Sequence, residues 1–433
     1  MRARPGSRRT FPRGAAASLL LRRPKLIVAA ISLAVSLLFV AALPTTLRSN
    51  ESSDYRSFYG PVAQALLAGR GFVGRDGLPA TRYPPGYPLI LAATWGTGDA
   101  FGVPRHVAIA ALHLVTAMLS ALLLFAIART AWGLPEALLP PLLWITYPIA
   151  LWLQKQPNSE MPFTVLLFGA VLLFLSAARR PGSGAFLWLA CGISAGLAML
   201  IRPIALGLGL VLAAAVFAVL PSLSRAAKAR AAALLLAGNF LGVLPWEIWA
   251  HSRTERVIPL STGGVASIRD GLTFAQRTRG LPSAVATLAG DLRGRYPEMR
   301  TTSGVARVLS GELADRPVAV LALFAVKTAR SWYGTESRRG EARTLLLQLP
   351  YLLLGGLSLW FSRRGPPAAR RLAVTVTLLV AYFWIMTIAA LSILRYMVPA
   401  MGLLFTVAPA VFLLRRRAPV GLPDEPRAEA VSA

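Results

Sequence analysis

Apolar residues along this chain occur in ten long blocks that are separated by short polar or Pro- and Gly-containing segments. Each block is about 17 to 25 residues long, which is the length that a helix needs to cross a bilayer. The predicted spans are residues 26–43, 106–128, 134–150, 160–178, 185–201, 203–221, 231–249, 344–361, 372–391 and 396–414. The pattern therefore predicts an all-α integral membrane protein with about ten transmembrane helices.

Two longer connections, roughly residues 44–105 and 250–343, interrupt the series of spans. Within the second, residues 317–326 are apolar but too few to cross a membrane, so we expect a helix that lies in the interface. The remaining organisation is simple. A basic N-terminus (1–25) precedes one polytopic domain (26–418), and a short polar tail (419–433) follows it.

The distribution of charge predicts the orientation of the spans. If the N-terminus is cytoplasmic, the inner connections carry clusters of Arg and Lys, whereas the short outer connections carry one basic residue each, Lys155, Arg202 and Arg395. The same arrangement leaves 14 of the 18 acidic residues outside. We therefore expect a multi-pass protein of a bacterial cytoplasmic (inner) membrane, part of the cell envelope, with both termini in the cytoplasm and its active site on the outer face.

Composition excludes several other classes of protein. With 55% hydrophobic and 15% charged residues, the chain is not a soluble globular protein. The net charge of +28 is distributed as short clusters between apolar spans, so we expect no nucleic-acid partner. The single cysteine, Cys191, lies inside a span and can form no intramolecular disulfide.

Polar residues at the outer ends of the spans indicate chemistry on a lipid-linked sugar. Outside a bacterial membrane no nucleotide sugars are available, so a sugar donor must be carried through the bilayer on a polyprenyl phosphate. Its phosphate is a weak base and leaves without a general acid, whereas the acceptor hydroxyl benefits from one carboxylate as general base. A fixed cation stabilises the departing phosphate. Asp54, Arg202 and Arg395 provide these groups on the predicted outer face.

Motifs in the first outer connection resemble a known family. Asp54-Tyr55, the segment 65–72 (ALLAGRGF) and the segment 83–88 (YPPGYP) are similar to the first outer loop of the GT-C superfamily glycosyltransferases, in their bacterial Rgt-like and protein O-mannosyltransferase-like branch. Further similar segments follow in family order at 159–160, 196–203, 245–246, 259–264 and 395–399. The resemblance therefore covers most of the chain.

This resemblance implies a multi-span glycosyltransferase that takes its sugar from a polyprenyl-phosphate donor, with Asp54 as the catalytic base of a single displacement. The acceptor would be a hydroxyl of an extracytoplasmic glycolipid, polysaccharide or protein, and membrane lipids surround the enzyme. Many relatives have a second acid where this chain has Tyr55, and a His where it has Tyr83. Both differences remove possible metal ligands, so the sequence gives no support for a divalent cation or another cofactor.

The other candidate site residues each have a structural alternative. Glu160 is either an acid that favours a helix N-terminus or a residue that binds acceptor or orients the site. Arg395 and Arg202 bind substrate phosphate or anchor the protein to lipid headgroups. Tyr83 and Tyr87 belong to a Pro-rich segment whose structural role is a stiff turn, and their rings could in addition stack on sugar or prenyl groups. Lys155 is the last residue that we expect to bind substrate.

Two other functions fit the same topology. A transporter or lipid-linked glycan flippase would show internal repeats and polar groups near the middle of the membrane, whereas here the ionisable residues lie at the outer span ends. An outer-face polysaccharide polymerase or ligase would share the topology but use a diphosphate-linked glycan. The acid of the first connection and the YPPGYP motif favour the monophosphate-sugar transferase.

Overall fold

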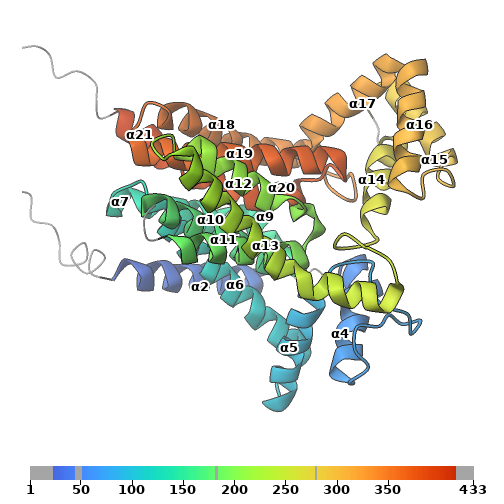
Figure 1. Ribbon diagram of the computed structural model, residues 1–433, viewed down its shortest axis with the longest axis horizontal. Helices are drawn as coiled ribbons and strands as arrows, with labels where there is room; N and C mark the ends of the chain where they lie inside the picture. Colours follow the sequence, from blue (N-terminus) through green and yellow to red (C-terminus); the bar gives the residue numbers. More distant parts are fainter. Residues whose placement is uncertain (1–22, 44–50, 181–183, 278–279, 416–433) are drawn as a thin grey trace, which may run out of the picture.

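The structure is a computed structural model that describes residues 23–43, 51–180, 184–277 and 280–415. Almost all of the basic N-terminus (1–22) and the whole polar tail (419–433) lie outside the described residues. The described chain is helical almost throughout, and its long helices pack side by side in one bundle (Figure 1).

Seven helices in the described ranges are long and apolar enough to cross a membrane. They are α2 (Pro24–Ala42), α6 (Arg105–Ala128), α10 (Glu160–Arg179), α13 (Arg225–Thr254), α18 (Glu341–Ser362), α19 (Pro367–Ala389) and the stretch Leu394–Phe412, which comprises α20 (Leu394–Phe405) and the start of α21 (Pro409–Arg415). Two shorter apolar helices, α11 (Ala185–Ile201) and α12 (Leu208–Val219), complete the bundle; the short η2 (Pro203–Ala205) precedes α12. The prediction of a multi-pass helical membrane protein is confirmed.

The predicted span 134–150 is not one continuous helix. It consists of α7 (Leu134–Ala137), α8 (Leu139–Thr146) and α9 (Pro148–Leu153). Tyr147 between the last two is extended, with ψ 114°. The cause is Pro148, because a proline lacks the N–H of a helical turn and forces the preceding residue away from helical geometry.

Glycines allow α11 and α13 to approach closely. A methyl group at Gly192 would overlap the carbonyl oxygen of Leu235, and one at Gly238 would overlap that of Leu189. Small residues at helix contacts are the usual means of packing inside membranes, where apolar burial alone does not drive association. This contact fixes the position of the end of α11, which carries Arg202.

The two long connections lie together at one end of the bundle (Figure 1). The first contains η1 (Tyr55–Tyr59), α4 (Gly60–Leu67) and α5 (Gly86–Ala100). The second contains α14 (Gly264–Thr273), η3 (Phe274–Arg277), α15 (Ser283–Gly294), α16 (Thr302–Asp315) and α17 (Pro317–Arg330). Helices α14 to α17 enclose an apolar core of their own, which includes Leu272, Val285, Leu288 and Leu323.

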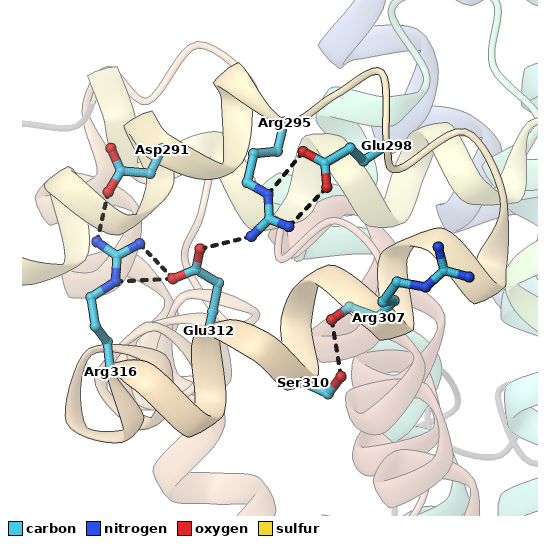
Figure 2. Close-up of polar contacts among 7 residues, drawn as sticks. All are labelled: Asp291, Arg295, Glu298, Arg307, Ser310, Glu312 and Arg316. Carbon is cyan, nitrogen blue, oxygen red and sulfur yellow. Dashed lines mark hydrogen bonds and ion pairs between the residues drawn. The ribbon is translucent and has the colours of Figure 1, made fainter.

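Ion pairs join the helices of this second unit (Figure 2). The buried carboxylate of Glu312 lies between Arg295, at 3.2 Å, and Arg316, at 2.5 Å. Arg316 also contacts Asp291 at 2.6 Å, and Arg295 contacts Glu298 at 2.8 Å. The pairs therefore connect α16 to α15 and to the turn that follows α15.

The apolar segment predicted to lie in the interface forms the first part of α17. Val320 and Leu323 are buried, whereas Val318 and Leu321 are 78% and 64% exposed. Lys327 donates hydrogen bonds to the carbonyl oxygens of Gly271 and Ala390, at 2.7 and 2.8 Å. One face of α17 is thus attached to α14 and to the end of α19, and the other is apolar and open.

Candidate active site

A pocket of about 220 Å³ lies where the two long connections meet the ends of α10, α11 and α20. Five residues predicted from the sequence to act in the site line it: Asp54, Tyr83, Glu160, Arg202 and Arg395. Their elements are far apart along the chain, so the packing of the bundle brings them together.

Asp54 directly precedes η1 and is partly buried. The Tyr83 hydroxyl donates a hydrogen bond to Asp54 Oδ1 at 2.9 Å. Burial, followed by the neighbouring Asp54 charge, raises the pKa of Tyr83, so this hydroxyl keeps its proton at neutral pH. The Tyr83 ring packs against Phe58 and Tyr59, each with its centroid 5.2 Å away. Asp54 is therefore held at the pocket wall by a rigid hydrogen-bond donor.

Glu160 lies between two arginines. Its Oε1 atom is 2.5 Å from Arg202 Nη1 and 2.7 Å from Arg395 Nε, and the Glu160 side chain is only 3% exposed. Arg202 also donates to the Ser159 hydroxyl at 2.9 Å. Both guanidinium groups lie near the ring of Tyr396, at 5.0 and 5.6 Å. One buried carboxylate thus fixes two cations side by side at the pocket.

Local sequence explains why these side chains reach the pocket. Pro203 ends α11 and leaves Arg202 extended, with φ −141° and ψ 121°. Asn158 Oδ1 accepts hydrogen bonds from the backbone N–H groups of Glu160 and Met161, which begins α10 at Glu160. Arg395 lies in the first turn of α20.

The Pro-rich segment of the first connection is fixed on both sides. A methyl group at Gly86 would come within 2.6 Å of the Leu200 carbonyl oxygen, so only glycine allows this contact with the end of α11. On the other side, Thr262 N–H and Gly263 N–H donate to the carbonyl oxygens of Thr81 and Arg82, at 2.9 and 3.1 Å. The YPPGYP segment therefore holds Tyr83 between α11 and the second connection.

Two predicted substrate-binding residues do not line this pocket. Tyr87 is fully buried and makes an edge contact with Tyr59, with ring centroids 5.0 Å apart. Lys155 lines a different cavity, and its ammonium lies 3.9 Å from the centre of the Trp152 ring. Tyr87 thus packs in the core here, and Lys155 faces another part of the molecule.

The structure adds residues that the sequence did not single out as site residues. Glu336 pairs with Arg395 Nη1 at 2.7 Å and is 57% exposed. It lies in the second connection, outside every recognised motif. Tyr396, in the segment 395–399, also lines the pocket and was not predicted to act there. Among the described residues, no group of three or more His, Cys, Asp and Glu side chains comes close enough together to hold a metal ion.

The chain is similar in sequence to one protein family and in structure to several solved proteins. Residues 83–249 match the dolichyl-phosphate-mannose-protein mannosyltransferase family. No curated protein sequence matches the chain. Its structure is similar to the archaeal oligosaccharyltransferase AglB from Archaeoglobus fulgidus, solved in complex with an inhibitory peptide and a dolichol-phosphate, with a TM-score of 0.56 and 13% identity over 92% of this chain and 51% of AglB.

Two further structures are similar. The same oligosaccharyltransferase in its apo form has a TM-score of 0.57, with 13% identity over 92% of this chain and 51% of that one. ArnT from Cupriavidus metallidurans, solved with undecaprenyl phosphate, has a TM-score of 0.45, with 15% identity over 92% of this chain and 77% of ArnT. The chain thus spans about half the length of AglB. The chain therefore shares the fold of AglB, and residues 83–249 are similar to the dolichyl-phosphate-mannose-protein mannosyltransferase family.

Proposed function

We propose that this protein transfers a sugar from a polyprenyl-phosphate donor to a hydroxyl group of an extracytoplasmic acceptor. The observation that carries the proposal is the shared pocket, in which the carboxylate of Asp54 and the paired guanidinium groups of Arg202 and Arg395 line one cavity. A carboxylate and fixed cations are the two groups that this displacement requires.

In the proposed reaction Asp54 is the general base. The acceptor oxygen attacks the anomeric carbon as its proton passes to an Asp54 oxygen, and the bond from that carbon to the phosphate oxygen breaks. The electron pair leaves with the polyprenyl phosphate. Tyr83 donates to Oδ1, which leaves the other carboxylate oxygen of Asp54 for the acceptor.

Arg202 and Arg395 are proposed to bind the phosphate. Their two positive charges exceed the single negative charge of the Glu160 that joins them. Glu336 also pairs with Arg395, but it is more than half exposed and its attraction is therefore weakened by solvent. The phosphate gains negative charge as it leaves, so these fixed cations stabilise the transition state more than the bound donor.

The proposal includes the location of the reaction. The distribution of basic residues between the short connections supports a pocket on the outer face of a bacterial cytoplasmic membrane, with both termini inside. AglB was solved with a dolichol-phosphate, and the matched family is described as dolichyl-phosphate-mannose-dependent, which supports the choice of donor.

Replacing Arg395 with Ala tests the role of the cations. We expect binding of a short-chain polyprenyl phosphate to weaken by about 10- to 100-fold, because a hydrogen bond to a charged group contributes about 1.5–3 kcal/mol. Binding is measured on the purified protein in lipid nanodiscs. Arg300→Ala, at an exposed position of the second connection, is the matched control and should bind as the wild type does. Unchanged binding by Arg395→Ala would remove the assigned role.

A further inference from the structure

Two basic side chains of α17 are buried. Lys327 is 0% exposed and Arg330 is 2% exposed. A charged side chain loses its hydration on burial, which costs free energy unless other groups of the protein bind it. Helix α17 leads from its own helical unit to the end of the bundle (Figure 1), and the proposed reaction assigns no role to either residue. The groups that these two side chains bind therefore indicate what they do.

Both side chains bind the segment 390–393, which connects α19 to α20. Lys327 Nζ donates to the carbonyl oxygen of Ala390 at 2.8 Å, and Arg330 Nη1 donates to that of Ser392 at 2.6 Å. The segment is not helical, so these carbonyl oxygens lack the partners that a helix would supply. The two buried cations satisfy them instead.

The turn that follows α17 continues this attachment. The Leu394 N–H donates to the carbonyl oxygen of Gly334 at 2.9 Å. A methyl group at Gly334 would come within 2.6 Å of the Ser392 carbonyl oxygen and 2.8 Å of the Arg330 carbonyl oxygen, so the two backbones are in close contact here. Leu394 directly precedes Arg395. Helix α17 and its turn thus fix the backbone from which the Arg395 side chain extends.

The same turn also holds the Arg395 side chain. Glu336 pairs with Arg395 Nη1 at 2.7 Å. Arg330 Nη2 donates to the carbonyl oxygen of Thr335, the residue before Glu336, at 2.7 Å. Glu341 Oε1 accepts from Arg330 Nη2 at 2.7 Å and from the Thr335 N–H at 3.0 Å. Arg330 therefore joins the segment before Arg395 to the turn that carries Glu336.

Arginine suits this connection because its guanidinium group is planar and has several N–H donors in fixed directions. Nη1 binds the Ser392 carbonyl oxygen, while Nη2 binds the Thr335 carbonyl oxygen and, together with Nε, the carboxylate of Glu341. A lysine at this position would keep the positive charge for Glu341, but its single nitrogen does not reproduce this planar set of contacts.

We propose that Arg330 is a positioning residue, which holds Arg395 in the orientation that binds the donor phosphate. This inference rests on the proposed function, since it takes Arg395 to bind that phosphate. A shift of Arg330 moves two supports of Arg395, the segment before it and the turn that carries Glu336. Positioning of this kind matters because a displacement of about 1 Å at a reacting group has a large effect on catalysis.

The test measures binding of short-chain polyprenyl phosphate to the full-length protein in lipid nanodiscs. We expect Arg330→Lys to weaken binding by about 3- to 10-fold, less than Arg395→Ala, because the phosphate-binding charge stays and only its support is lost. Gly334→Ala should act in the same direction without a change of charge. Gly311→Ala in α16 is its matched control, because a methyl group there meets nothing within 4 Å. Thermal unfolding shows that the variants are folded, and Gly334→Ala decides the test if Arg330→Lys does not fold.

A double-mutant cycle distinguishes positioning from a general loss of structure. In the Arg395→Ala background, Arg330→Lys and Gly334→Ala should weaken lipid-phosphate binding no further, because the residue that they position is gone. An equal loss of binding in both backgrounds would overturn the inference. So would wild-type binding by the single variants.

One further measurement does not depend on the proposed function. The Arg395 side chain is 19% exposed, and its reaction with phenylglyoxal, an arginine-selective reagent, is followed by mass spectrometry. We expect faster modification of Arg395 in Gly334→Ala than in Gly311→Ala, and equal rates would overturn the inference. If Arg395→Ala bound lipid phosphate as the wild type does, the proposed donor site would fail, whereas faster modification in Gly334→Ala would still show that the turn holds Arg395.

Discussion

Replacement of Asp54 by Asn is expected to lower the rate of sugar transfer by about 10²- to 10⁴-fold, the usual contribution of general base catalysis. Asn has nearly the same shape and can still accept the hydrogen bond from Tyr83, but it cannot take the proton of the acceptor hydroxyl. Membrane insertion and binding of polyprenyl phosphate should therefore stay close to those of the wild type.

Asp76→Asn is the matched control for this substitution. Asp76 lies in the same connection, is exposed, and accepts only a local hydrogen bond from the Leu78 N–H in the structure. Tyr83→Phe should lower the rate less than Asp54→Asn, because it removes the group that positions the base and leaves the base itself. Transfer by Asp54→Asn at more than a tenth of the wild-type rate would rule Asp54 out as the base.

Replacement of Glu160 by Gln should have the largest effect on stability. The substitution leaves Arg202 and Arg395, whose side chains are 10% and 19% exposed, without the buried carboxylate that pairs with both. Breaking a buried ion pair by removing one partner typically costs about 3–5 kcal/mol, since the remaining charge is buried and uncompensated. We expect a corresponding fall in the free energy of unfolding, measured by denaturant titration in mixed micelles.

An exposed ion pair provides the control. Asp99 and Arg105 contact each other at 3.1 Å with side chains 48% and 43% exposed, and exposed pairs contribute little. Asp99→Asn should therefore leave the unfolding curve almost unchanged. If Glu160→Gln were as stable as Asp99→Asn, Glu160 would not be the residue that holds the two arginines together.

The sequence predicted the membrane helices well because apolar length is a direct consequence of bilayer thickness. It did not predict the interruption of residues 134–150, although Pro148 could have indicated it. The separate core of helices α14 to α17 was also not predicted. Its apolar residues, such as Leu288 and Leu292, are diluted by charged ones and form short helices without a membrane-length signal.

The sequence predicted which side chains would gather near one end of the bundle, but not how they pair. Asp54, Glu160, Arg202 and Arg395 were all placed at outer span ends, and they do line one pocket. That Glu160 pairs with both arginines depends on how three helices pack, which no local pattern encodes. Lys155 lies only five residues before Glu160, yet the turn between them directs it to the other cavity.

The proposed donor is a sugar on a polyprenyl monophosphate. To test this, the purified protein and its Asp54→Asn variant are incubated with a panel of polyprenyl-monophosphate and polyprenyl-diphosphate sugars, with a crude envelope extract as acceptor. With monophosphate donors we expect sugar transfer and release of polyprenyl monophosphate by the wild type, and transfer at least about a hundredfold slower by Asp54→Asn. Transfer from diphosphate-linked donors only would refute the monophosphate donor, and transfer by Asp54→Asn at more than a tenth of the wild-type rate would refute the base.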